Sequence, residues 1–188
     1  MRVTRQTFQG VQAKMSCSSL LIRLLAWIGF ERQRLSMAHA AWLVSDWNTA
    51  ETWALRAARS GSTEAHTFLA TLYLSRNAPG DSRRAFEASR LAAERGSAAG
   101  MQSHGWCFEQ GVGVDQDPES ALVWYRAAAD NGRVECQIAV ARMLLDGTRG
   151  TVDAHAARDY AILAKKAGAT EADELIARAE SSVLSPKR

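Results

Sequence analysis

The sequence repeats itself at a nearly constant interval, and this repetition constrains the fold more than any other feature. Four nine-residue segments share small and apolar positions and end in glycine, with successive endings 35, 36 and 36 residues apart. Internal repeats of this length indicate stacked units, each of which completes the hydrophobic core of its neighbours. The four segments are Trp53–Gly61, Ala88–Gly96, Trp124–Gly132 and Tyr160–Gly168.

The residues before each closing glycine have the spacing of a helix. Ala121, Trp124, Tyr125, Ala128 and Ala129 fall at i, i+3, i+4, i+7 and i+8, which places them on one helical face. Glycine then adopts the left-handed conformation that ends a helix without steric cost. Alanine is abundant and the 188 residues include only three prolines, a balance that favours helices. The sequence therefore predicts an all-α protein.

An aspartate precedes the apolar pattern of each of these helices. Asp46, Asp81, Asp117 and Asp153 lie three or four residues before it, where a carboxylate can cap free backbone N–H groups and oppose the positive helix end. Pro118 suits the first helical position, where its missing N–H costs nothing. We expect all four aspartates to begin helices.

A second helix is predicted between each closing glycine and the next aspartate. In the clearest unit the turn Gly111-Val-Gly-Val-Asp115 joins the two helices. A small residue recurs nine positions after each closing glycine, and we expect it to let the paired helices approach closely. Each unit is thus predicted to be a helix hairpin. The small residues are Ala70, Gly105, Ala141 and Ala177.

The hairpin pattern resembles the Sel1-like repeat family, a relative of the tetratricopeptide repeat. The turn at 111–115 followed by Ala121–Gly132 carries the resemblance most strongly. Unit 133–168 lacks the Gly-x-Gly-Val turn, and unit 62–96 is one residue shorter and has Arg76–Gly80 in its place. The resemblance implies a right-handed α-solenoid of helix hairpins with an extra N-terminal helix and a C-terminal capping helix.

The repeats divide the chain into an N-terminal region, a repeat domain and a short tail. Met15 and Met37 are candidates for the translation start besides Met1. The predicted divisions are a disordered basic arm at 1–16, N-terminal amphipathic helices at 17–45, a Sel1-like repeat domain at 46–183 and a tail at 184–188. Within the repeat domain they are a partial unit at 46–61, full units at 62–96, 97–132 and 133–168, and a cap at 169–183.

The charge distribution argues against nucleic-acid binding by the repeats. Residues 1–36 hold six basic side chains and one acid, a net charge of +5, which leaves −2 for the rest of a chain whose total is +3. A nearly neutral body offers no broad basic face to a phosphate backbone. The basic arm is either a contact for an anionic partner or simply solvated.

Cysteine usage and hydropathy favour a cytoplasmic protein. Cys17, Cys107 and Cys136 are odd in number and lack a Cys-x-x-Cys spacing, which is typical of buried thiols in a reducing compartment. The apolar run from Leu20 to Phe30 is shorter than the roughly 20 residues that span a bilayer, and an arginine interrupts it. The same arginine makes the run a poor secretion signal.

Residue types that often form active sites occur here without the partners they need. Gly111-Val-Gly lacks the Gly-Lys-Ser/Thr of a phosphate-binding loop and no strand is predicted before it. His104 and Cys107 lie on one helical face, but a four-ligand zinc set is missing; we expect a part-exposed histidine and a packing cysteine. Ser103 points away from the adjacent histidine. Trp53 and Trp124 share a repeat position and are predicted core residues. We predict no catalytic residue, metal or cofactor.

Binding is the remaining class of function. In tetratricopeptide-like folds the first helix of each hairpin lines the concave side. Trp106 and Arg142 stand out there, because aromatic and arginine side chains dominate binding hot spots, and their equal register places them side by side. The alternative for Trp106 is packing beneath its own turn. The predicted outward positions are Glu64, Thr67, Thr71, Gln102, Trp106, Glu109, Glu135, Ile138 and Arg142.

The main functional hypothesis is a bacterial, non-catalytic scaffold or adaptor that binds a partner protein or peptide on the concave surface. The resemblance supports it, because members of the family commonly act as adaptors. A second hypothesis is hydrolysis of a β-lactam-type small molecule, as in cysteine-rich relatives, although those carry a disulfide in each repeat. A third is peripheral membrane attachment through residues 14–36, whose basic and apolar side chains suit an interface.

Overall fold

The computed structural model of the protein describes residues 34–148 and 152–184. This part of the chain forms nine helices and no strand, which confirms the predicted all-α class. The predicted arm at 1–16, the predicted N-terminal helices before residue 34 and residues 185–188 of the tail lie outside it. The helices are α2 (Arg34–Leu43), α3 (Trp47–Arg59), α4 (Thr63–Arg76), α5 (Asp81–Glu94), α6 (Ala98–Gln110), α7 (Pro118–Asp130), α8 (Val134–Asp146), α9 (Ala154–Lys166) and α10 (Ala172–Leu184).

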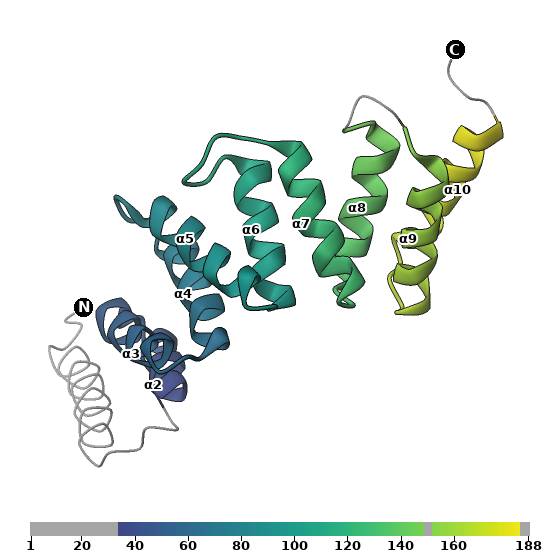
Figure 1. The fold of residues 1–188 in the computed structure, drawn as a ribbon. Helices are drawn as coiled ribbons and strands as arrows, with labels where there is room; N and C mark the ends of the chain where they lie inside the picture. Colours follow the sequence, from purple (N-terminus) through teal and green to yellow (C-terminus); the bar gives the residue numbers. More distant parts are fainter. Residues whose placement is uncertain (1–33, 149–151, 185–188) are drawn as a thin grey trace, which may run out of the picture.

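The helices pair into hairpins that follow one another along an arc (Figure 1). The first helices α4, α6 and α8 each pack against the second helices α5, α7 and α9, and every helix contacts the next one in the chain. The helix α4 also contacts α6, and α8 contacts α10. Equivalent helices of neighbouring hairpins approach each other on the inside of a curved stack. The first helices therefore line the concave side, and the fold is the predicted α-solenoid.

The closing glycines end the second helices as the sequence predicts. Gly61 has a φ of +93°, and its N–H donates to the carbonyl of Ala58 at 3.0 Å, while the N–H of Ser62 donates to Ala57 at 3.2 Å. This pair of bonds is the Schellman motif, which satisfies carbonyls that the helix leaves free. The second of these bonds, which spans five residues, recurs at the end of the second helix in each later unit. The same local geometry therefore ends every hairpin.

Three of the four predicted aspartate caps are present. The carboxylates of Asp46, Asp117 and Asp153 accept backbone N–H groups at the start of α3, α7 and α9. Asp81 is different, because Gly80 holds the cap position and Asp81 is the first residue of α5. Its carboxylate accepts the N–H of Ala78 and two bonds from a neighbouring guanidinium instead.

The small residues permit close helix contact in the three full units. Ala70 and Ala141 are fully buried, and a Cβ on Gly105 would lie 3.0 Å from the Tyr125 ring in the paired helix. The prediction was wrong for Ala177, which is exposed. The helix α10 begins four residues after its glycine instead of two, so the buried position moves to Ala179.

The glycine-rich turn of unit 97–132 also serves packing. Gly113 has a φ of +72°, and a Cβ there would lie 2.4 Å from the carbonyl oxygen of Ser82 at the start of α5. The turn thus presses its backbone against the preceding hairpin, which only glycine allows. This geometry agrees with the sequence interpretation of the turn as an interhelical connection.

Candidate functional site

A groove runs along the concave face, where two adjoining hollows of about 580 and 320 Å³ meet. The hollows share Thr67, Thr71 and Ala99, so they form one surface across α4 and α6, which we call the concave groove. The larger hollow extends to α2 and the smaller one to the start of α8. The principal side chains along the groove are His39, Trp42, Glu64, Thr67, Phe68, Thr71, Arg95, Gln102, Trp106 and Arg133.

Aromatic side chains form the floor of the larger hollow. Phe68 on α4 is nearly buried and contacts two rings from α2: His39 at a centroid distance of 4.5 Å, and Trp42 edge-on at 5.5 Å. Edge-to-face rings at this spacing attract one another. The extra N-terminal helix therefore both covers the first hairpin and provides one wall of the groove.

The smaller hollow combines an aromatic wall with polar groups. Trp106 on α6 lines this hollow and is 39% exposed. The Nε of Arg133 donates to the amide oxygen of Gln102 at 3.0 Å, which joins the start of α8 to α6. The hydroxyl of Thr67 makes the equivalent contact one repeat earlier, 3.0 Å from the hydroxyl of Ser97.

The structure brings five of the nine predicted outward residues together in the groove. They are Glu64, Thr67, Thr71, Gln102 and Trp106. All five lie on α4 or α6, the two first helices that contact each other, so the repeat register placed them on one continuous surface.

The other four predicted residues do not line the groove. Glu109 accepts a hydrogen bond of 2.7 Å from the Tyr125 hydroxyl, and Ile138 packs against the core. Glu135 lies 3.6 Å from Arg133. Arg142 pairs with Glu171, just before α10, instead of lying with Trp106 along the groove. The helix α8 contacts α6 less closely than α6 contacts α4, so side chains of α8 at the same register do not join the groove.

Other groove residues escaped the sequence analysis. His39 and Trp42 lie on α2, outside the repeats, so no register was available for them. Arg95 and Arg133 lie in the turns between hairpins, which the repeat pattern indicates only as connections. A basic residue next to the closing glycine in two successive units is the feature of the sequence that could have identified them.

The predicted part-exposed His104 is in fact buried, with 2% of its surface accessible. Phe86, Phe108 and Trp124 surround its ring at centroid distances of 4.7–5.1 Å. Its Nδ1 lies 3.1 Å from the hydroxyl of Ser89. The sequence did not show this enclosure, because the rings come from three different helices. With no access from solvent, this cluster serves packing.

Cys107 and Cys136 are free, buried thiols. Burial raises the pKa of Cys107 and raises that of Cys136 to about 11, so both thiols are protonated at neutral pH and poorly nucleophilic. In residues 34–148 and 152–184 no three His, Cys, Asp or Glu side chains are grouped to hold a metal ion. Trp53 and Trp124 are partly buried against the core, less deeply than predicted.

We expect His104 to make stability depend on pH. Burial lowers its pKa to about 4, against about 6.5 in an unfolded chain. Between these values the unfolded chain binds a proton that the folded chain does not, so the free energy of unfolding falls as the pH falls. His104 should account for about 2 kcal/mol of the loss between pH 7 and pH 5.

Urea unfolding of the wild type and of His104→Gln at both pH values measures this effect. The substitution should reduce the loss of stability between pH 7 and pH 5, whatever its effect at pH 7. A residual fall is expected, because burial also lowers the pKa of His66. The same fall in both proteins would contradict the assignment to His104.

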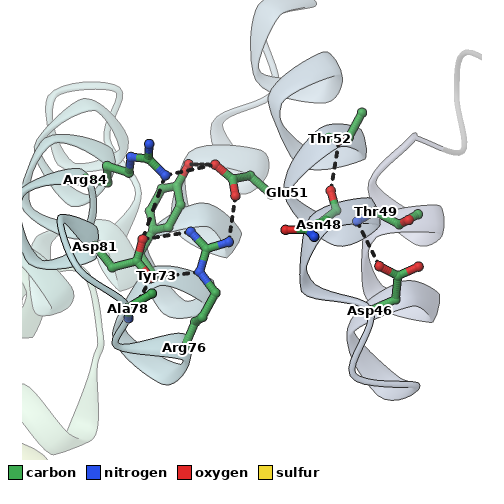
Figure 2. A network of polar contacts seen from close by, with 10 residues as sticks. All are labelled: Asp46, Asn48, Thr49, Glu51, Thr52, Tyr73, Arg76, Ala78, Asp81 and Arg84. Atoms are coloured by element: carbon green, nitrogen blue, oxygen red, sulfur yellow. Dashed lines mark hydrogen bonds and ion pairs between the residues drawn. The ribbon is translucent and has the colours of Figure 1, made fainter.

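A partly buried polar network ties the first three described repeat helices together (Figure 2). The Arg76 guanidinium makes two bonds of 2.7 Å to Asp81 and one of 2.7 Å to Glu51, which also accepts the Tyr73 hydroxyl at 3.0 Å. Asp81 is 1% exposed, and the bonds from Arg76 hold the pKa of its carboxyl below the usual value. Because its charges are paired within the protein, the network is a structural clamp.

No helix in the described ranges is long and apolar enough to cross a bilayer. The stacked hairpins, the repeated glycine stops and the concave groove define the class of helical-repeat solenoids. A family model described as Sel1 repeat matches residues 63–97, 98–132 and 134–168. These matches cover more than half of the sequence, and the chain belongs to the Sel1 repeat family, as the resemblance predicted.

Solved structures with the same fold include two bacterial proteins. One is a protective antigen of uropathogenic Escherichia coli with an SLR fold (TM-score 0.73, 23% identity, 86% of this chain and 36% of that chain). The other is a Sel1 repeat protein from Oxalobacter formigenes (TM-score 0.70, 20% identity, 86% and 48%). The chain spans less than half the length of either, and at these identities the likeness concerns the fold alone. No curated protein matches the chain.

Proposed function

We propose that the protein is a non-catalytic scaffold that binds a segment of a partner protein in the concave groove. The observation that carries the proposal is the continuous surface across α2, α4 and α6, with half-exposed Trp106 in one hollow and Trp42 in the other. Aromatic side chains that stay accessible in a concave site are the usual anchors of protein recognition. The buried, protonated thiols fit the cytoplasmic location that the cysteine pattern favours.

The polar side chains of the groove suit a peptide backbone. Hydroxyl and amide groups of Thr67, Thr71 and Gln102 line the same hollows as the two tryptophans. An extended segment has unpaired N–H and C=O groups along its whole length, and these need partners when it is desolvated. Alternating apolar and polar positions on α4 and α6 therefore match an extended peptide better than a small apolar ligand.

Replacing Trp106 with alanine should weaken partner capture at least tenfold, because a central aromatic anchor typically contributes about 2 kcal/mol or more to binding. The tagged protein is used for affinity capture from its native host, and retained proteins are quantified by mass spectrometry. Thermal stability should change little, since the ring is 39% exposed.

Leu163→Ala is the matched control, because Leu163 is a large, 46% exposed side chain on α9, outside the groove. It should retain the same partners as the wild type. If Trp106→Ala retains them too, or if both variants lose them equally, the groove is not the binding surface.

A further inference from the structure

Two arginines lie on the groove without a matching number of acids. Arg95 lines the larger hollow and Arg133 the smaller one, whereas Glu64 is the one acid of residues 34–148 and 152–184 that lines either. The groove thus has a net positive charge, although residues 37–188 together carry −2. This local excess of positive charge is opposite in sign to the rest of the folded body.

The arginines are incompletely neutralised. Arg95 is exposed and makes no ion pair with the residues that the structure describes. The Arg133 guanidinium is bonded to the neutral amide of Gln102. The acid that it pairs with in the described part of the chain, Glu135, lies 3.6 Å away and is 67% exposed. Glu64 accepts a hydrogen bond from Ser62 and not from either arginine. Both cations therefore keep the capacity to bind an incoming carboxylate.

We propose that the partner segment is an acidic, extended peptide with large apolar side chains, and this inference rests on the proposed function. Its apolar side chains occupy the hollows beside Trp42 and Trp106, and its Asp or Glu side chains pair with Arg95 and Arg133 at the edge. A carboxylate accepts bidentate bonds from a guanidinium, which fixes the register of the peptide as well as its charge.

The test begins with a display library of random 12-residue peptides, from which those that bind the full chain are selected. Fluorescein-labelled versions of the selected peptides are then measured by anisotropy. We expect enrichment of Asp or Glu next to aromatic or large aliphatic residues. Exchanging those acids for Asn or Gln should weaken binding at least fivefold at 50 mM salt, and less at 500 mM, because salt screens exposed pairs.

The double variant Arg95→Gln/Arg133→Gln should bind the acidic peptides only as tightly as the wild type binds their amide versions. Its affinity for the amide versions should be the same as that of the wild type. Arg59→Gln/Arg83→Gln, which removes two exposed arginines outside the groove, is the matched control and should bind like the wild type. Thermal unfolding confirms that each variant folds.

The outcomes separate the two proposals. The inference is overturned if the selected peptides need Trp106 for binding but carry no acidic residue. It is also overturned if both double variants bind the acidic peptides with equally reduced affinity. In either case the proposed function still holds. If the selection yields no peptide whose binding depends on Trp106, both the inference and the proposed function fail.

Discussion

Asp81→Ala is expected to lower the free energy of unfolding by about 3–5 kcal/mol. The carboxylate is 1% exposed and accepts two bonds from Arg76 and one from the N–H of Ala78. Its loss leaves a partly buried guanidinium with one acidic partner, Glu51, and a free N–H in the turn before α5. A partly buried guanidinium that loses one of its two carboxylate partners loses far more stabilisation than a surface ion pair contributes.

Chemical denaturation of Asp81→Ala and Glu87→Ala measures the difference. Glu87 lies on the same helix and also pairs with an arginine, Arg90, but both side chains are well exposed. Its loss should cost less than about 1 kcal/mol. Similar losses in both variants would show that the network in Figure 2 is not the clamp that we describe.

Gly100→Ala is expected to destabilise the protein by about 2–3 kcal/mol, although alanine is normally the better helix residue by about 1 kcal/mol. A Cβ at Gly100 would lie 2.5 Å from the Cβ of Ala92 and 2.8 Å from backbone atoms of Ala92 and Ala93. Backbone cannot rotate away, so α5 and α6 must move apart, and the seam between two hairpins opens.

Gly105→Ala is the comparison for this prediction, because it makes the same change in the same helix. Its nearest neighbours are Tyr125 ring atoms at 3.0 and 3.1 Å, which can shift by a few tenths of an ångström. Thermal and urea unfolding should therefore show a smaller loss than for Gly100→Ala. A gain in stability from Gly100→Ala would mean that the two hairpins are less tightly packed than the structure shows.

Most of the fold could be predicted from the sequence repeat. Each closing glycine occupies a position that needs a left-handed backbone conformation. Because four of them recur at a nearly constant spacing, they fix the length and order of the hairpins. The buried small residues Ala70 and Ala141 follow from the same register, as does the position of α4 and α6 on the concave side. These features depend on short-range geometry, which a sequence displays directly.

The departures from prediction involve contacts between units. Asp81 keeps the register of the other aspartates, but its carboxylate bonds to Arg76, the last residue of α4, instead of capping the helix end. His104 is buried because α5 and α7 contribute rings on either side of it. Ala177 is exposed because α10 begins two residues late. Such effects depend on neighbours that the repeat period does not identify.

About half of the candidate site was predictable for the same reason. Thr67, Thr71, Gln102 and Trp106 lie at repeated positions, and the structure places them together in the groove. His39, Trp42, Arg95 and Arg133 belong to α2 and to turns, where the register does not apply. The wall at Trp42 depends on how α2 packs against Phe68, a contact between segments 26 residues apart.

Site-specific photocrosslinking in the native host tests most directly whether the concave groove is the binding surface. A photoreactive residue replaces Thr71 in the groove or, as a control, Val123, which is 54% exposed on α7. We predict a crosslinked complex with a second protein from position 71 and none from position 123. Crosslinks from position 123 alone would contradict the account.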